Sequence, residues 1–237
     1  MHMSAFDPSL LQRPVCLFPL PNCVLLPGAA LPLHVFEPRY RRMVGDLLAL
    51  PDGRRLIAIS LLLDSDAKSA LTNEAAIEPV VGVGEVAQCM ALPDGTYNIL
   101  MVGRARARIV RDDRTGVYRR AELRFLPSRP RDMLSTVHDA IDDVRTLLGD
   151  FRHFEIADRE MIAHLLELSP DPTTLIDVGA FHLLGADESG VKQRILAEER
   201  LEVRAEILAI HLRQRLHQWR ARQFQSSSDW PPVGPMN

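Results

Sequence analysis

The sequence predicts an α+β fold, in which a small closed β-barrel with one inserted helix precedes a helical bundle. Two features of the 237-residue chain lead to this prediction. Up to residue 126 the chain consists largely of short apolar runs separated by turn residues, without the repeated strand-helix alternation of a doubly wound sheet. Beyond residue 137, apolar residues recur every three or four positions, as they do on the buried face of a helix.

Turn residues separate the strands expected in the barrel half. Asp94-Gly95 predicts a tight hairpin, because glycine tolerates the positive φ of such turns, and Asp112–Gly116 predicts the next reversal. Pro19 lacks an amide hydrogen, so we expect its strand to lie at a sheet edge or a bulge there. A polar stretch from Asp64 to Glu78 predicts a loop. The expected strands are Val15–Leu20, Leu31–Phe36, Arg55–Leu63, Val80–Leu92, Tyr97–Arg111 and Val117–Leu126.

Helical spacing occurs once inside the barrel half and repeatedly after it. Glu37 to Leu50 predicts the inserted helix, with Pro38 in a first turn where its missing amide hydrogen is tolerated. The segment Asp171–Thr174 provides capping residues for a later helix that ends near Gly185. The other expected helices are one through Val137, Ile141, Val144 and Leu148, then Ile156–Leu168, Val191–Leu196 and a long last helix. The apolar seam of that last helix fits a bundle core better than a dimer contact; its members are Leu201, Ala205, Leu208, Leu212, Leu216 and Trp219.

These elements divide the chain into five parts. Residues 1–14 are an N-terminal extension, residues 15–126 the barrel, and residues 127–133 a linker marked by Pro127 and Pro130. Residues 134–224 form the helical bundle. The tail at 225–237, QSSSDWPPVGPMN, is polar and rich in proline, and we expect it to be disordered.

Composition excludes several classes of protein. Hydrophobic residues make up 46% and charged residues 25%, with a net charge of -3, which indicates a soluble globular protein and argues against nucleic-acid binding through bulk positive charge. Three cysteines without CxxC spacing predict neither a disulfide framework nor a zinc site. The N-terminus lacks a signal-peptide pattern, and the apolar run at Leu56–Leu63 is too short to cross a bilayer. We therefore expect a cytoplasmic protein without membrane association.

Four segments carry a resemblance to a known family. The run LFPLPNCVLLPGAALPLHVFEPRY, from Leu17 to Tyr40, resembles the opening signature of the N-terminal domain of Lon proteases, and its FEPRY form is typical of stand-alone and eukaryotic relatives. The similarity continues through VGVGEV at Val81–Val86, LPDGTYNILMVGRARARI at Leu92–Ile109 and KQRILAEERLEVR at Lys192–Arg204. It covers roughly Val15 to Leu212.

The resemblance implies both a fold and a role. The fold of the family is a PUA-like β-barrel followed by a helical bundle, in agreement with the division inferred from the residue patterns. In full-length Lon the domain helps to recognise unfolded or tagged protein substrates, and in cereblon a similar domain holds an adaptor protein. We therefore expect a non-catalytic interaction module for protein quality control, which binds unfolded polypeptide or a protein partner.

The sequence contains no recognisable catalytic motif. It has no GxxxxGK[ST] loop to hold nucleotide phosphates. Lon-type cleavage uses a serine activated by a lysine, and the two lysines, Lys68 and Lys192, stand in other contexts. The clustered cysteines of a cereblon-type zinc site or a RING finger are missing, and His34, among apolar residues, is interpreted as a hydrogen-bonded core histidine. We expect no catalytic, cofactor-binding or metal-binding residues, and no enzyme activity.

Two groups of residues are candidates for binding. For polypeptide we propose an apolar surface made by Leu25, Leu26 and Pro27 together with Phe36 and Tyr40. The alternative for Phe36 and Tyr40 is a packed corner between strand and helix.

The second group is a basic strand. Arg104, Arg106 and Arg108 alternate with apolar residues, so a strand would point all three guanidinium groups to one face. Because PUA folds elsewhere bind RNA and arginine binds phosphate with two hydrogen bonds, RNA binding is the alternative function. The nearby acids Asp112 and Glu122 favour an ion-paired face instead, and nucleic acid is therefore not the expected partner.

Overall fold

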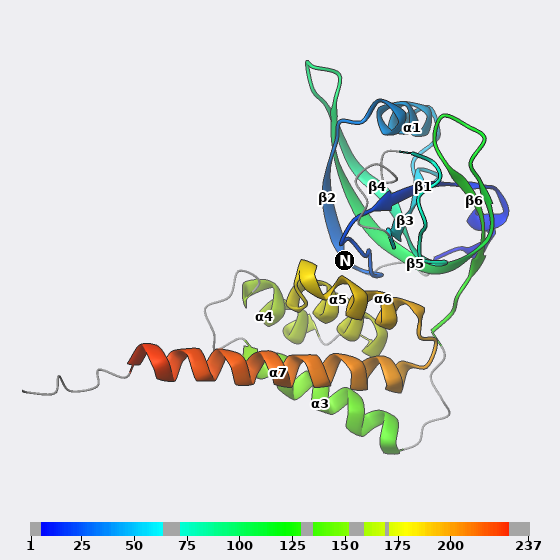
Figure 1. Ribbon diagram of the computed structural model, residues 1–237. Helices are drawn as coiled ribbons and strands as arrows, with labels where there is room; N and C mark the ends of the chain where they lie inside the picture. Colours follow the sequence, from blue (N-terminus) through cyan, green and yellow to red (C-terminus); the bar gives the residue numbers. More distant parts are fainter. Residues whose placement is uncertain (1–5, 64–71, 129–134, 152–158, 169–170, 228–237) are drawn as a thin grey trace, which may run out of the picture.

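The computed structural model describes residues 6–63, 72–128, 135–151, 159–168 and 171–227 (Figure 1). It confirms the α+β class, with a strand-rich half lying on a helical half. The strands are β1 (Val15–Leu20), β2 (Ala30–Val35), β3 (Leu56–Leu61), β4 (Val80–Ala91), β5 (Tyr97–Asp113) and β6 (Arg120–Phe125). The helices are α1 (Pro38–Leu48), α3 (Ser135–Phe151), α4 (Arg159–Leu168), α5 (Pro172–Leu183), α6 (Ser189–Ala197) and α7 (Leu201–Ser227), with short 3-10 helices η1 (Pro8–Gln12) and η2 (Ala186–Glu188).

The pairings of five strands close into a ring. The order in the sheet is β2-β5-β4-β3-β1-β6, and β6 pairs in addition with β5. The long strand β5 makes this possible, because its first half pairs with β2 and its second half with β6. Strand β2 lies outside the ring, attached to β5 at the edge of the sheet.

Local sequence signals explain how the strands begin and turn. Gly95, at φ 77°, turns the chain between β4 and β5, and the Asp94 side chain accepts a hydrogen bond from the Thr96 amide at 2.9 Å. The expected hairpin is thereby confirmed. Pro19 pairs with Ser60 of β3, whereas β6 reaches only Val15 and Cys16 on the other side of β1. Pro19 therefore lies along an open edge among the described strands, as expected.

Helix α1 covers one end of the strand ring (Figure 1). Its buried residues Tyr40, Met43, Val44 and Leu47 pack with Phe18 and other residues of the ring. The helix begins at Pro38, with Glu37 as its N-cap, and ends two residues earlier than expected. Burying one face of α1 in this way holds its two ends at fixed positions on the ring.

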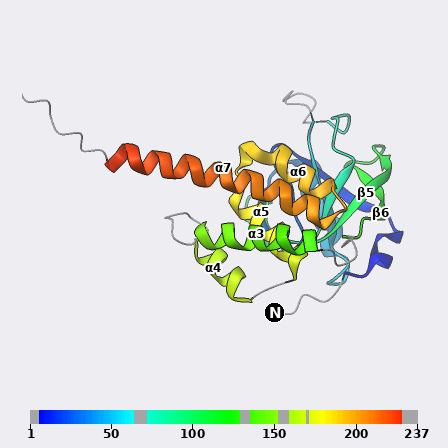
Figure 2. The same cartoon turned by 90° about the horizontal axis from the view of Figure 1, so that it is seen from below.

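The five helices α3 to α7 share one hydrophobic core, which also includes Val24, Leu26, Val80 and Leu126 of the strand half. The α7 seam is buried in this core at Leu201, Ala205, Leu208, Leu212 and Leu216, as expected for these five residues. Helix α7 then extends past the other helices (Figures 1 and 2). It continues to Ser227, so the disorder expected from Gln225 is wrong for residues 225–227, while residues 228–237 lie outside the described part.

Candidate functional site

The LPG loop is part of the core and does not form a binding surface. Leu25 and Leu26 are fully buried, so their assignment to a polypeptide-binding surface is wrong. Leu25 packs in the core beneath α1, whereas Leu26 packs in the core of the helical half. A side chain at Gly82 would overlap the Leu25 carbonyl, and one at Gly103 would overlap the Leu26 carbonyl. The loop is therefore held tightly between the two halves of the molecule.

The FEPRY segment divides into a buried and an exposed part. Tyr40 is buried, with its ring 4.1 Å from the ring of Phe18, and the Arg39 guanidinium lies 4.4 Å above it. Burial raises the pKa of Tyr40 to about 12. Tyr40 is thus a corner residue and not a binding residue, which corrects the prediction. Phe36, by contrast, is 62% exposed, and Pro27 is half-buried.

Phe36 belongs to an exposed sheet surface that we name the β2 face, formed by Pro32, His34, Phe36, Met90 and Asn98. Asn98 of β5 pairs with His34 on one side and with Met90 on the other, and cross-strand partners point to the same side of a sheet. The His34 ring stacks on Phe36 with centroids 6.1 Å apart, and His34 Nδ1 donates to Asn98 Oδ1 at 2.8 Å. His34 is exposed, so its interpretation as a core histidine is wrong. Met90 is 56% exposed.

Strand β2 also presents a free backbone edge. The Gly103 amide donates to the Ala29 carbonyl at 2.8 Å, and bonded positions alternate along antiparallel strands. The backbone groups of Leu31, Leu33 and Val35 therefore face β5. Those of Ala30, Pro32 and His34 face away from it, where no described strand pairs with them. Pro32 has no amide hydrogen, so the outward donors along this edge are the amides of Ala30 and His34.

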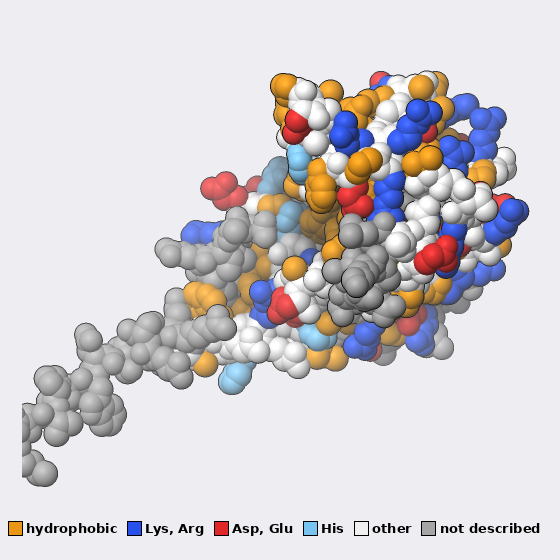
Figure 3. All heavy atoms as spheres, turned by 45° about the horizontal axis from the view of Figure 1, so that its top comes forward, with side chains coloured by type: hydrophobic (Ala, Val, Ile, Leu, Met, Phe, Trp, Pro, Cys, Tyr) orange, Lys and Arg blue, Asp and Glu red, His pale blue; other side chains and the backbone are white. Residues whose placement is uncertain are grey.

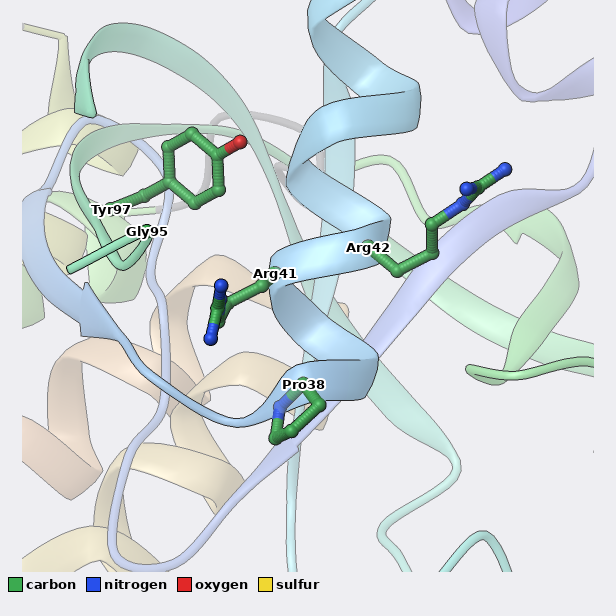
Figure 4. Close-up of a pocket in the computed structure, with 5 residues that line it drawn as sticks. All are labelled: Pro38, Arg41, Arg42, Gly95 and Tyr97. Atoms are coloured by element: carbon green, nitrogen blue, oxygen red, sulfur yellow. The ribbon is translucent and has the colours of Figure 1, made fainter. Parts of the chain in front are cut away.

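A shallow hollow of about 330 Å³ lies at the start of α1, lined by Pro38, Arg41, Arg42, Gly95 and Tyr97. Figure 4 shows Arg41 extending from α1 toward the Gly95 turn and Tyr97, whereas Arg42 points away along the helix. In the space-filling view of this end of the molecule, hydrophobic and basic side chains lie next to one another (Figure 3). The surroundings of the β2 face are thus mixed apolar and basic.

The basic face predicted on β5 is not a solvent-exposed cluster. Arg106 is buried, and its guanidinium donates to the carbonyls of Leu196 and Pro127, each at 3.0 Å, and also to the Glu198 carbonyl. Burial lowers the pKa of Arg106 to about 10, with the Arg204 charge acting in the same direction. This arginine fastens the strand half to the helical half. The prediction that all three guanidinium groups form one ligand-binding surface is therefore wrong.

The other arginines of β5 and its surroundings are largely ion-paired. The Arg104 guanidinium lies 3.6 Å from the Glu85 carboxylate, and the Arg111 guanidinium lies 3.2 Å from the Glu122 carboxylate. Arg108, also part of the predicted face, is half-buried. Within the described ranges, no three His, Cys, Asp or Glu side chains are grouped to hold a metal ion. No described helix is both long and apolar enough to span a membrane.

Period-two alternation could have located the β2 face from the sequence. It places Pro32, His34 and Phe36 on one side of a strand. The hairpin register around Asp94-Gly95 then brings Asn98 and Met90 beside them. The long apolar run from Leu17 instead favoured the loop residues Leu25 and Leu26 as a binding surface.

The ring of strands, the covering helix and the helical half together define one α+β domain architecture. The chain belongs to the family described as the ATP-dependent protease La (LON) substrate-binding domain, which matches residues 14–214. The expected family is thereby confirmed.

Curated relatives and solved structures agree with this family. The chain is 31% identical over 111 residues to Lon protease 2 of Syntrophobacter fumaroxidans, covering 47% of this chain and 13% of that protein. It is 27% identical over 194 residues to Lon protease of Escherichia coli, covering 78% of this chain and 23% of the protease. The chain thus covers less than a quarter of the length of each of these relatives.

Two solved structures share the fold. The N-terminal domain of the Mycobacterium avium complex Lon protease superposes with a TM-score of 0.65 at 16% identity, covering 84% of this chain and 98% of that domain. The Lon N-terminal domain protein from Xanthomonas campestris superposes with a TM-score of 0.53 at 22% identity, covering 83% of this chain and 96% of that protein.

Proposed function

We propose that this domain binds extended or unfolded polypeptide through the β2 face, without catalysing a reaction. The observation that carries the proposal is the exposure of Phe36 and Met90, at 62% and 56%, on one sheet surface beside a free strand edge. Membership of a substrate-binding family supports a protein ligand. No observation favours RNA binding, because the Arg106 guanidinium is engaged in hydrogen bonds between the strand half and the helical half.

The expected mode is addition of a strand to β2. An extended segment pairs its backbone with the outward groups of Ala30 and His34, and alternate side chains rest on the β2 face. Because main-chain groups make these bonds, the mode accepts many sequences. Such breadth suits the recognition of unfolded chains.

Weak affinity follows from the size of the surface. Burial of a phenylalanine or methionine contributes about 1.5 to 3 kcal/mol, and a Kd of about 1 μM requires about 8 kcal/mol. Ordering the bound segment offsets part of the gain. We therefore expect dissociation constants in the micromolar range or above, with little dependence on salt.

The test is fluorescence anisotropy with a labelled, permanently unfolded protein. We expect the double variant Phe36→Ser/Met90→Ser to bind about tenfold or more weakly than the wild type, in low and in high salt. The matched control is Val110→Ser/Val117→Ser, since these valines are 65% and 66% exposed at the far end of β5 and before β6. Equal affinities of the two double variants would reject the β2 face as the binding surface.

We propose that the ring of strands is a PUA-like β-barrel over residues 15–126, joined by a linker at 127–133 to a helical bundle at 134–224. Binding without ATP hydrolysis or peptide cleavage is supported by a family match confined to the substrate-binding domain. The free thiols of Cys16, Cys23 and Cys89 suit the reducing cytoplasm, in which we propose that the protein acts.

A further inference from the structure

A second candidate site lies at the other end of α1 from the β2 face. It is a cavity of about 490 Å³ between η1, the end of α1, the start of β1 and the start of β6. One part of its wall is apolar and is formed by Leu10, Leu47 and Leu50. Another part is basic and is formed by Arg13, Arg54 and Arg120.

The acid in the lining, Asp46, is already compensated. Its carboxylate accepts a hydrogen bond from the Tyr118 hydroxyl at 3.0 Å and lies 3.0 Å from the Arg42 guanidinium. Arg120 in turn donates to the Tyr118 hydroxyl at 2.8 Å. These contacts hold Arg120 against the cavity wall and leave the lining with excess positive charge.

Two arginines of the lining have no acidic partner in the described part of the chain. Arg13 follows η1 and Arg54 precedes β3, and neither forms an ion pair with a described carboxylate. Both side chains are exposed at the cavity, where they reach solvent or a ligand. Elsewhere many arginines are paired, as Arg114 is with Glu74 and Asp112.

We propose that this cavity binds an apolar group that ends in a carboxylate, such as the C-terminal residue of a polypeptide. The guanidinium group of arginine matches a carboxylate in shape and charge and binds it with two parallel hydrogen bonds. The leucines supply an adjoining surface for an aliphatic side chain, and the volume lies in the range of small-ligand pockets. A small aliphatic acid has the same chemistry as a chain terminus.

In its polypeptide form this inference rests on the proposed function, but it concerns separate residues. Phe36 precedes α1, whereas Asp46 and Leu47 lie in its last turn, and an 11-residue helix separates the two ends by roughly 16 Å. Substitutions at one site therefore leave the other intact. An unfolded protein that still binds the Arg13/Arg54 variant, but not the Phe36/Met90 variant, would uphold the proposed function alone.

The experiment measures anisotropy of a short fluorescein-labelled peptide that ends in Leu-Leu with a free carboxylate. The same peptide as a C-terminal amide is compared directly, and octanoate serves as the competing small acid. We expect the amide, and separately the Arg13→Gln/Arg54→Gln variant, to show at least tenfold weaker binding, which corresponds to about 1.4 kcal/mol. The variant Arg111→Gln/Arg124→Gln carries the same charge change on the β5–β6 surface and should bind as the wild type does.

A second variant tests the apolar wall. Leu50 is 42% exposed, so Leu50→Glu should fold and yet repel a carboxylate, with binding at least tenfold weaker. Displacement of the peptide by octanoate would support a site for apolar carboxylates in general, and its failure to displace would support a site for chain termini. Equal binding of acid and amide, or unchanged binding by the folded Arg13→Gln/Arg54→Gln variant, would overturn the inference.

Discussion

The backbone carbonyl of Leu25 lies against the α-carbon of Gly82, in the space that any side chain at residue 82 would occupy. We predict that Gly82→Ala displaces the buried loop and lowers the free energy of unfolding by about 3 kcal/mol, because a backbone atom, unlike a flexible side chain, cannot move aside at small cost. Urea unfolding followed by circular dichroism measures the loss.

Gly149→Ala is the control for this substitution. Gly149 lies within α3, and no described atom outside its own helix backbone lies within 4 Å of where a Cβ would stand, so alanine there should raise the free energy of unfolding by about 0.5 to 1 kcal/mol. Similar effects of the two changes would show that the loop is not held by close approach to Gly82.

The buried pair of Asp177 and Arg204 yields a prediction about charge. Both side chains are fully buried, and burial raises the pKa of Asp177 although Arg204 opposes the shift. In Arg204→Met the carboxylate loses its partner, and we expect a loss of about 3 to 5 kcal/mol at neutral pH. Because the folded-state pKa of the Asp177 carboxyl is raised, the folded state takes up a proton at higher pH than the unfolded state does. The destabilisation of Arg204→Met should therefore shrink toward acidic pH, where Asp177 is neutral in both states.

The matching double variant separates the pair from its environment. Asp177→Leu/Arg204→Met removes both charges and should be far less destabilised than Arg204→Met alone. Chemical unfolding of the wild type and the variants at neutral and acidic pH measures both effects. A double variant no more stable than the single one would contradict the role of the unpaired carboxylate.

The raised pKa of Tyr40 predicts that the protein loses stability at alkaline pH. Burial raises its folded-state pKa to about 12, whereas an unfolded tyrosine titrates near 10. The unfolded state therefore loses its proton first, and stability from this group falls as pH rises from about 10 to about 12. Tyr40→Phe should match the wild type at neutral pH and show a shallower decline over that window, by on the order of 2 kcal/mol. Parallel declines in thermal or urea unfolding would contradict this assignment.

Sequence patterns predicted the elements better than the surfaces. Apolar periodicity predicted α1 and the α7 seam, because a helix that buries one face carries apolar residues every three or four positions. The same apolarity made Leu25 and Leu26 look available, although a loop threaded between two cores buries them from both sides. A single sequence does not state which apolar run becomes the interior.

Charged residues show the same limit. Strand alternation placed Arg104, Arg106 and Arg108 on one side of β5, but only the docking of the helical half determines that Arg106 is buried there. The β2 face depends on pairing among β2, β5 and β4, that is, on contacts between His34, Asn98 and Met90 from separate strands. Its residues alternate as expected, but their neighbours come from tertiary structure.

The free edge of β2 gives the sharpest test of strand addition. The amide of His34 faces away from β5, so His34→Pro removes an outward donor and leaves the sheet bonds of β2 in place. Pro32, two residues earlier, occupies the equivalent position in the native strand. His34→Val is the matched control, because it removes the same imidazole and retains the amide.

We expect His34→Pro to bind the unfolded-protein probe about five- to tenfold more weakly than His34→Val, the size of one net backbone hydrogen bond of about 1 kcal/mol. Both variants lose the contact with Asn98, so that loss cancels in the comparison. Thermal unfolding verifies that both are folded, and anisotropy titration measures the two dissociation constants. Equal affinities would show that polypeptide does not pair with the β2 edge, and would restrict recognition to side-chain contacts with Phe36 and Met90.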